Sequence, residues 1–356
     1  MNNRHKKICI IGAFGFHMVD KTTGGQPAKT RQLYYTLADY YGSENITYIE
    51  TYGWKSHPIR MLLDVLKCAK YSDAMIMLPA HNGVQIFSRL LIYCKKHYGT
   101  KIFYDVIGGW LAEKTRGDQA LGRQLMQFDG VWVESNSMKR NLEQQGFTNV
   151  TAVPNFRKMK ILTPDELGYS QEYPLQMCTF SRVMKEKGIE TAVDVVNNIN
   201  SKLGYAAIKL DIYGPIEEAD REWFEHLRQK FNENISYKGC VKPNESGEVL
   251  RKYFALLFPT HFYTEGVPGT VIDAYCAGVP VISAKWSNFY DVVEEGKTGF
   301  GYSFDDAEEF ARILFDAVET PRVLLDMKNN CVEKAWHFHS DYVVKTIASD
   351  LKEKGI

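Results

Sequence analysis

Residues 258–283 read FPTHFYTEGVPGTVIDAYCAGVPVIS, a run that predicts a strand, a glycine-rich loop, a helix, a glycine turn and a second strand. This order is typical of a βαβ unit. One carboxylate, Glu265, lies on the predicted loop, and a second, Asp273, follows eight residues later. Eight helical residues advance about 800°, which puts both carboxylates on nearly the same side and roughly a dozen ångströms apart. The spacing predicts that one extended ligand touches both.

The loop between these carboxylates suits an anionic ligand that also carries hydroxyl groups. Its glycines let the backbone approach closely, and the free N–H groups at the start of the helix favour phosphate. Carboxylates beside such a site accept hydrogen bonds from sugar hydroxyls. A nucleotide sugar carries both kinds of group.

The same run resembles the signature of the family 4 nucleotide-sugar glycosyltransferases, which have the GT-B fold. That signature is a glutamate, seven residues, a second glutamate and an Ala-Gly-Val-Pro-Val turn. This chain keeps Glu265 and has Asp273 at the second position. The resemblance implies that Glu265 orients the donor sugar or its phosphates, while Asp273 holds the ribose hydroxyls. It further implies donor contacts from the loop residues Gly266, Val267, Pro268, Gly269 and Thr270. An ordinary βαβ unit with solvated acids is the alternative.

A second match lies in residues 179–188, between a predicted strand and the next helix. Two cations, Arg182 and Lys187, lie at the two ends of this short loop. Positive side chains stabilise the negative charge that develops on a diphosphate leaving group. The segment is similar to the family's Gly-Arg, four residues, Lys-Gly motif, with Ser181 in place of the first glycine. The resemblance implies that Arg182 and Lys187 grip the donor diphosphate, and with Glu265 they are the expected catalytic residues. Two solvated loop cations are the alternative.

Further donor-side candidates are glycines at predicted strand and helix ends. Gly214, Gly239 and Val241 resemble family positions that line the pocket for the nucleotide base, because a flat base can lie against a glycine backbone. Gly24 and Gly25 precede a predicted helix in the first half and resemble the family's glycine pair that faces the diphosphate. A plain turn is the alternative at Gly239, and a plain loop before the helix is the alternative at Gly24 and Gly25.

Acceptor-side residues are harder to find, because no histidine follows the strand at 101–106 where many family members have one. His81, after an earlier strand, and Asp105 are candidates to fill that role. Gly109 and Trp110 follow Asp105 and are expected to border the acceptor. A loop histidine is also commonly structural or solvated.

The chain alternates short apolar runs with helical patterns, which predicts an α/β fold of two Rossmann-like, doubly wound domains, the GT-B architecture. We expect an N-terminal acceptor-binding domain over 1–160 and a C-terminal nucleotide-sugar-binding domain over 161–335. Residues 336–356 are expected to form a helix that returns to the first domain, as in many GT-B enzymes. The proline-containing stretch 154–173 is the expected connection and hinge.

Composition fits a globular protein, with 356 residues, 45% apolar and 24% charged. Zero net charge conceals an asymmetry, since residues 1–155 carry 19 Lys+Arg and 12 Asp+Glu and the remainder has the opposite imbalance. The basic half suggests a peripheral contact with anionic membrane, solvated lysines being the alternative. Seven scattered cysteines predict reduced thiols, and we find neither a leader nor an apolar run of about 18 residues. We therefore expect a cytoplasmic protein that visits the inner face of the membrane, with no nucleic acid partner.

The sequence thus predicts a retaining glycosyltransferase that moves a hexose-type sugar from a UDP- or GDP-sugar to a hydroxyl of a glycan or lipid-linked acceptor. Polysaccharide or glycolipid biosynthesis is the expected setting. Metal and other cofactors are not expected, because the sequence has no Asp-x-Asp triad and no zinc-like spacing. Two alternatives stay open: a nucleotide-sugar epimerase or hydrolase of the same fold, and a catalytically silent sugar-nucleotide-binding subunit.

Overall fold

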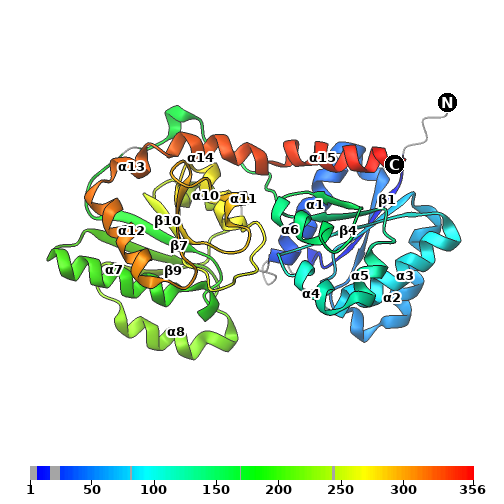
Figure 1. The fold of residues 1–356 in the computed structure, drawn as a ribbon, viewed down its shortest axis with the longest axis horizontal. Helices are drawn as coiled ribbons and strands as arrows, with labels where there is room; N and C mark the ends of the chain where they lie inside the picture. Colours follow the sequence, from blue (N-terminus) through cyan, green and yellow to red (C-terminus); the bar gives the residue numbers. More distant parts are fainter. Residues whose placement is uncertain (1–5, 17–24, 81, 169, 243–244) are drawn as a thin grey trace. The chain divides into compact units, whose positions relative to one another are not determined.

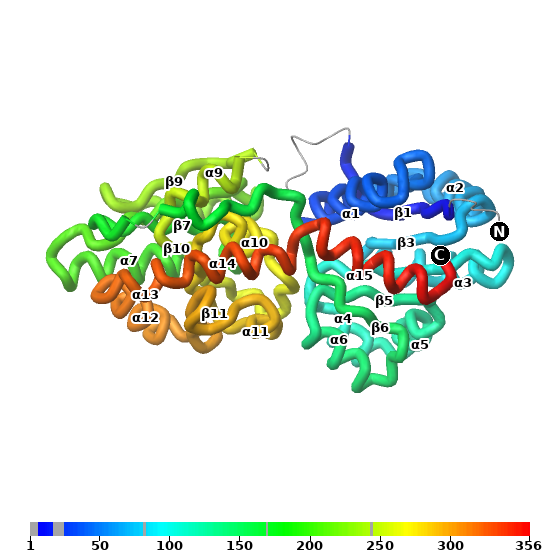
Figure 2. The backbone as a smooth tube through the Cα atoms, turned by 90° about the horizontal axis from the view of Figure 1, so that it is seen from above, coloured from blue at the N-terminus to red at the C-terminus, as the bar shows by residue number. Residues whose placement is uncertain are grey.

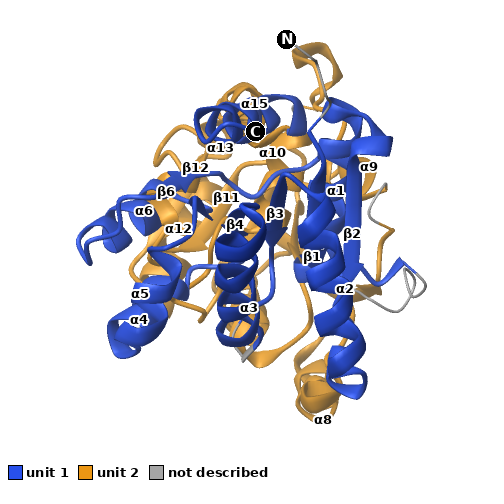
Figure 3. Ribbon diagram, turned by 90° about the vertical axis from the view of Figure 1, so that its right-hand side faces the viewer, with its two compact units in different colours: residues 1–158, 340–356 blue, residues 159–339 orange. Residues whose placement is uncertain are grey.

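The structure is a computed structural model that describes residues 6–16, 25–80, 82–168, 170–242 and 245–356. The chain divides into two compact units, coloured separately in Figure 3. Unit 1 comprises residues 1–158 and 340–356, and unit 2 comprises residues 159–339. The predicted boundary at 160/161 lies two residues from the observed one, and the returning segment begins at 340 rather than 336.

Unit 1 contains a six-stranded parallel sheet with the strand order β2-β1-β3-β4-β5-β6. The order reverses direction between β1 and β3. The strands are β1 (Ile8–Gly12), β2 (Ile46–Glu50), β3 (Ala74–Met77), β4 (Lys101–Asp105), β5 (Gly130–Val133) and β6 (Val150–Ala152). The helices are α1 (Gly25–Tyr41), α2 (Pro58–Tyr71), α3 (Asn82–Tyr98), α4 (Leu111–Gly117), α5 (Gln119–Leu125), α6 (Asn136–Glu143) and α15 (Ser340–Glu353).

Unit 2, where Figure 1 labels β7, β9 and β10, also has a six-stranded parallel sheet, but with the different strand order β12-β11-β10-β7-β8-β9. The strands are β7 (Leu175–Phe180), β8 (Ile208–Tyr213), β9 (Ile235–Gly239), β10 (Ala255–Phe258), β11 (Val281–Ala284) and β12 (Gly299–Tyr302). The helices are α7 (Ile189–Leu203), α8 (Arg221–Leu227), α9 (Ser246–Leu250), α10 (Gly269–Cys276), α11 (Phe289–Val292), α12 (Ala307–Glu319), α13 (Arg322–Leu325) and α14 (Lys328–Ala335). Counted within the unit, this is the doubly wound order, which reverses between β7 and β10.

Both sheets are covered by helices on both faces, as expected for buried parallel strands. On β10, Leu256 packs with α10 and α14, whereas Leu257 packs with α7 and α12. On β1, Ile10 packs with α1 and α15, whereas Ile11 packs with α2 and α3. Neighbouring residues of a strand therefore serve opposite cores.

Helix α15 belongs to unit 1 although it follows all of unit 2 in the chain. It lies beside α1 in Figure 2, and its apolar residues Val343, Ile347 and Leu351 are buried in the core with strands β1 and β3. Its Asp350 accepts hydrogen bonds from Trp132 Nε1 at 2.8 Å and Thr151 Oγ1 at 2.9 Å. This helix completes the core of the first unit.

Some predicted elements need correction. Helices α4 and α5 and strand β12 were not predicted. The pattern of residues 321–331 predicts one helix, but these residues form α13 and the start of α14. The stretch 154–173, expected to connect the domains, mostly packs within unit 2: Leu162 and Leu167 cluster with Val332, and Leu162 N donates to Cys276 O at 2.9 Å. The chain passes between the units at 158/159 and again at 339/340.

Candidate functional site

The strand order of unit 2 places its candidate site between β7 and β10. In a doubly wound sheet, ligands bind outside the carboxyl ends of the strands where the order reverses. The loop after β7 holds Arg182 and Lys187, and the loop after β10 holds Glu265. Two loops that were singled out separately in the sequence therefore leave adjacent strands at this point.

Lys187 and Glu265 form an ion pair between the lysine ammonium and Glu265 Oε1. Thr260 Oγ1 donates to the same carboxylate oxygen at 3.2 Å. The ammonium also lies over the rings of Phe258 and Phe262, at 5.6 and 5.1 Å from their centroids. Both charged side chains are largely but not fully shielded from solvent, so the pair can still meet a ligand.

Gly188 lets the two loops approach each other. Its φ is +66°, and a Cβ there would lie 1.7 Å from Pro259 O, which no side chain could tolerate. The backbone N–H of His261 also donates to Glu186 O at 2.8 Å. The Lys-Gly of the motif thus supplies a cation and then the contact that fixes it beside the Glu265 loop.

The Glu265 loop is supported from behind by two buried residues that follow β11. Asn288 Nδ2 donates to Glu265 O at 2.6 Å, and Trp286 Nε1 donates to Gly266 O at 3.2 Å. Sequence analysis missed both, because their contacts join positions about twenty residues apart. They hold the loop without taking up the Glu265 carboxylate.

Helix α10 begins at Gly269, so the helical geometry predicted for Glu265 and Asp273 was wrong. Glu265 lies in the turn before the helix, whereas Asp273 lies more than one turn inside it and is partly buried. Pro268 is buried and caps the helix, with Pro268 O accepting from Val271 N at 3.1 Å. Thr270 Oγ1 is buried and has no hydrogen-bond partner among the described residues.

Arg182 is paired with a residue that the sequence did not point to. Its Nη1 lies 2.6 Å from Glu217 Oε1, and both side chains are exposed enough to exchange partners. A diphosphate that binds Arg182 therefore has to compete with Glu217.

The ends of β8 and β9 bring together Gly214 and Gly239, the two glycines that were predicted to line the base pocket. Gly214 N donates to Gly239 O at 2.9 Å, and Tyr237 Oη donates to Gly214 O at 2.8 Å. A Cβ on Gly214 would lie 1.8 Å from Ser181 O, so only glycine fits there. Around Gly239 no atom lies within 4 Å of a built Cβ, which leaves open space at this strand end. Val241 follows, partly buried.

Unit 1 contains a buried charge cluster that sequence analysis missed, apart from Asp105. Lys29 Nζ of α1 lies 2.9 Å from Asp105 Oδ1 and 3.0 Å from Glu134 Oε1, and it donates to Val106 O at 2.8 Å. Burial raises the pKa of Asp105 more than the neighbouring ammonium lowers it. Burial alone would lower the pKa of Lys29, but Asp105 and Glu134 outweigh it and raise that pKa.

This cluster holds the loop that was predicted to border the acceptor. Besides the bond to Val106 O, Gly108 N donates to Glu134 Oε1 at 3.3 Å. Gly109 and Trp110 are partly buried, and Trp110 Nε1 donates to Ile107 O at 2.8 Å. Because Asp105 is fully buried and ion-paired, its position fits support of this loop better than direct contact with an acceptor.

One further unit 1 candidate, Gly25, follows β1 at the reversal of the strand order between β1 and β3. Gly25 is the first residue of α1, and no atom lies within 4 Å of a built Cβ. Gly24 and His81 lie outside the described residues. The loop after β1 is held by Glu50, whose carboxylate accepts from Phe14 N, Gly15 N and Tyr52 N at 2.7–3.0 Å.

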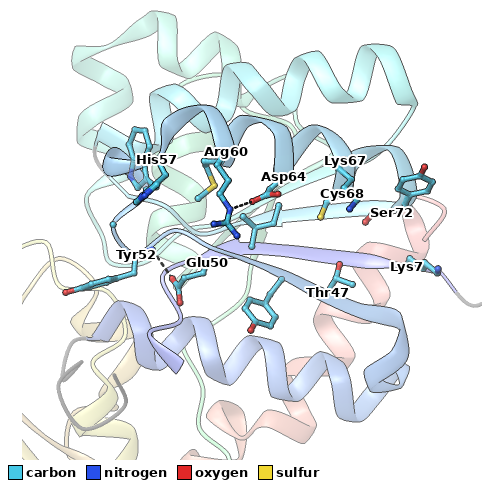
Figure 4. A pocket seen from close by; sticks show the side chains of 16 residues that line it. Lys7, Thr47, Glu50, Tyr52, His57, Arg60, Asp64, Lys67, Cys68 and Ser72 are labelled. Carbon is cyan, nitrogen blue, oxygen red and sulfur yellow. Dashed lines mark hydrogen bonds and ion pairs between the residues drawn. The ribbon is translucent and has the colours of Figure 1, made fainter. Parts of the chain in front are cut away.

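A groove of about 610 Å³ runs between the edge strand β2 and helix α2 (Figure 4). Arg60, Asp64, Lys67 and Cys68 line it from α2, and Thr47 lines it from β2. Sequence analysis identified no groove at this place.

Within the described part of the chain, no group of three or more His, Cys, Asp or Glu is placed to hold a metal ion. None of the described helices is long and apolar enough to cross a membrane.

Comparison with known proteins finds a family match within unit 2. The family model described as glycosyl transferases group 1 matches residues 175–319. A putative colanic acid biosynthesis glycosyltransferase, WcaL of Salmonella typhimurium, is 26% identical over 158 residues, which are 41% of this chain and 38% of that protein. The sulfoquinovosyl transferase SQD2 of Arabidopsis thaliana is 26% identical over 125 residues, 34% of this chain and 23% of that protein. The matches thus span less than half the length of these relatives.

Solved structures match over nearly the whole chain. HepE of Anabaena in complex with UDP has a TM-score of 0.76 at 15% identity, covering 98% of this chain and 100% of that chain. Sucrose-phosphate synthase of Thermosynechococcus elongatus has a TM-score of 0.74 at 15% identity, covering 98% of each. The predicted fold class is confirmed: the protein has the two-sheet GT-B fold of glycosyltransferases, and residues 175–319 within it are similar to glycosyl transferases group 1.

Proposed function

We propose that the protein is a glycosyltransferase that moves a hexose-type sugar from a UDP- or GDP-sugar to a hydroxyl of a glycan or lipid-linked acceptor. The observation that carries this proposal is the Lys187–Glu265 pair at the strand reversal of unit 2. A cation and a carboxylate side by side suit a donor that has a diphosphate next to sugar hydroxyls.

In this proposal each donor-side residue has a distinct role. Lys187 and Arg182 bind the diphosphate and stabilise the charge that develops on it, while Glu265 accepts from the donor sugar. The amides at the start of α10 add partial positive charge near the phosphates. Asp273 binds the ribose hydroxyls, and the glycines at the ends of β8 and β9 border the base.

The proposed reaction retains the anomeric configuration and uses no metal, as in family 4. The bond between the anomeric carbon and the phosphate oxygen breaks, and the acceptor oxygen forms a new bond to that carbon. The acceptor proton passes to the departing phosphate oxygen, and the nucleoside diphosphate leaves. This route needs no side chain as a base, which fits a buried, ion-paired Asp105.

Relatives support the setting of the proposal. HepE has been solved with UDP, with UDP and glucose, and with UDP-glucose. WcaL is described as a putative colanic acid biosynthesis glycosyltransferase, and SQD2 as a sulfoquinovosyl transferase. We infer a role in polysaccharide or glycolipid biosynthesis, in the cytoplasm or at the inner face of the membrane.

Incubation of the purified protein with UDP- and GDP-sugars, with and without lipid-diphosphate acceptors, tests this proposal. Nucleoside diphosphate released only in the presence of acceptor supports transfer. A changed sugar nucleotide without acceptor identifies an epimerase, and release without acceptor identifies a hydrolase. Donor binding without turnover across the panel indicates a silent subunit, and each of these three results rejects the proposal.

Arg182→Ala tests whether Arg182, which can exchange Glu217 for a diphosphate, stabilises the leaving group. We expect turnover to fall at least about a hundredfold, the scale of losing one electrostatic donor to the transition state. Arg221→Ala is the matched control, because Arg221 is also paired with a glutamate, Glu218, on the surface of unit 2. Equal losses in both variants, measured as initial rates of transfer, contradict the assigned role.

A further inference from the structure

Helices α2 and α3 lie side by side on the outside of unit 1 (Figure 3), and both present apolar side chains to solvent. Ile59, Leu62 and Leu63 of α2 are 74%, 43% and 60% exposed, and Ile86 and Tyr93 of α3 are 49% and 47% exposed. Scattered apolar residues on a surface are ordinary, but a group on two adjacent helices marks a site of interaction.

The same two helices carry an excess of positive charge. The exposed cations are Arg60, Lys67 and Lys70 on α2 and Arg89 and Lys96 on α3. Helix α3 contains no Asp or Glu, and α2 contains only Asp64, which lies 3.9 Å from Arg60. The other four cations form no ion pair with any residue that the structure describes. We call these five cations and the five apolar residues above the α2–α3 face.

Helical geometry interleaves the two kinds of side chain. At about 100° per residue, Ile59, Leu63 and Lys67 fall within roughly 80° of one another on α2. On α3, Ile86 and Arg89 fall within roughly 60° by the same count. On each helix these apolar and cationic groups thus point in the same direction, while Arg60 and Leu62, about 160° apart by the same count, lie at the two edges of the exposed side of α2.

The groove between β2 and α2 adds one further cation, Lys7, at the flank of this face. Arg60 and Lys67 line the groove together with Lys7 (Figure 4). The exposed rings of Tyr52 and Tyr71 border the same groove. Cations and tyrosines in this arrangement suit the polar boundary of a membrane.

We propose that the α2–α3 face binds the surface of an anionic phospholipid bilayer. The apolar side chains enter the boundary between headgroups and acyl chains, and the cations meet the lipid phosphates. A second copy of the chain is a poorer occupant, because two such positive faces repel each other. The purpose of this binding, to reach a lipid-linked acceptor, rests on the proposed function, whereas the binding itself requires no catalysis.

Vesicle flotation with the full chain tests this inference. Vesicles of phosphatidylglycerol and phosphatidylcholine are compared with vesicles of phosphatidylcholine alone at about 0.1 M salt. We expect the protein to float with the anionic vesicles only. Because each cation near such a surface contributes about 1 kcal/mol, Arg89→Gln/Lys96→Gln should weaken partitioning about thirtyfold. Leu63→Ser should weaken it about tenfold, with no recovery at low salt.

Matched controls distinguish binding through the α2–α3 face from nonspecific electrostatic or hydrophobic binding elsewhere on the protein. Lys139→Gln/Arg140→Gln makes the same charge change on α6 of unit 1, and Val323→Ser removes an exposed apolar side chain from α13 of unit 2. Both should partition like the parent protein. Equal binding to neutral vesicles, or equal losses in controls and face variants, overturns the inference. Self-association that the face variants abolish in the absence of vesicles overturns it in favour of a second copy.

Nucleotide binding is measured on the same variants. Unchanged affinity for UDP and GDP shows that unit 2 is intact. If the vesicles bind and no sugar is transferred to any acceptor, the proposed function fails and the membrane inference stands.

Discussion

Each unit of this protein places a lysine close to the carboxyl ends of its parallel strands, beside two carboxylates in unit 1 and one in unit 2, yet the two groups differ in their access to solvent. In unit 1, the side chains of Lys29, Asp105 and Glu134 are 2%, 0% and 4% exposed. In unit 2, those of Lys187 and Glu265 are 13% and 17% exposed. The same chemistry can therefore serve structure in one unit and ligand binding in the other.

The difference extends to the hydrogen bonds of the two ammonium groups. Lys29 Nζ donates to Glu134 Oε1 and Val106 O and is ion-paired with Asp105, so its contacts all lie within the buried cluster. Lys187 is paired with Glu265 and otherwise lies over two aromatic rings. A diphosphate can thus bind Lys187 without first breaking a complete buried network.

Among the substitutions proposed, Lys29→Met should cause the largest loss of stability. Removing the cation leaves two buried carboxylates without their partner, and we expect a loss of about 3–5 kcal/mol in the free energy of unfolding. Urea denaturation followed by circular dichroism measures this loss. Lys158→Met removes an exposed lysine that is paired with Asp39, and it should cost less than about 1 kcal/mol. Similar losses in the two variants argue against the structural role of the buried cluster.

Lys187→Met should reduce the rate of sugar transfer strongly and the free energy of unfolding only slightly. We expect the rate of sugar transfer to fall about 10²–10³-fold, while the free energy of unfolding changes by less than half of the loss expected for Lys29→Met. Initial rates and urea denaturation of the same preparation provide both numbers. A variant that unfolds easily but keeps its specific activity shows that Lys187 has a structural role like that of Lys29.

Gly188→Ala tests the close approach of the two loops in unit 2. The substitution adds backbone strain and a clash with Pro259 O, so we expect a loss of about 1–3 kcal/mol in stability and weaker nucleotide binding. Gly204→Ala is the control, because it adds backbone strain without a clash: Gly204 has a φ of +74° but open space around a built Cβ. Denaturation and nucleotide titration of both variants measure the losses of stability and affinity. Equal losses in the two variants would show that the close approach of Gly188 to Pro259 O is unimportant.

Asp273→Asn should have the smallest effect. It keeps the shape of the side chain and removes its charge, so donor affinity should fall roughly tenfold, the scale of one hydrogen bond to a charged group. Isothermal titration with the nucleoside diphosphate measures this. A large fall in turnover at unchanged affinity shows that Asp273 acts on the reacting atoms instead.

Local sequence patterns were sufficient to predict most of the sheet and the positions of the unit 2 loops. The sequence predicts strands at 46–50, 130–133, 175–180 and 255–258, because each is a short apolar or alternating run between turn residues. These ranges are the observed bounds of β2, β5, β7 and β10. Strand β12 was missed because its glycines lower strand propensity. The structure shows why they are needed: a Cβ on Gly299 would lie 2.1 Å from Val281 O.

Long-range partners were beyond prediction from one sequence. Lys29 and Glu134 are 105 residues apart, and no local spacing links them. The same holds for Arg182 with Glu217, and for Trp286 and Asn288 behind the Glu265 loop. Such contacts depend on which strands become neighbours, and that is fixed only by the complete topology.

The position of α15 has a consequence for the order in which the protein is made. Ribosomes synthesise chains from the amino end, and domains generally fold as units as they emerge. The core of unit 1 includes Val343, Ile347 and Leu351, and Trp132 and Thr151 find their acceptor on Asp350. Unit 2 is continuous in the chain and can complete its fold first. The first half to leave the ribosome is thus the last to finish folding, and until then it has to keep its apolar strands from pairing with other chains.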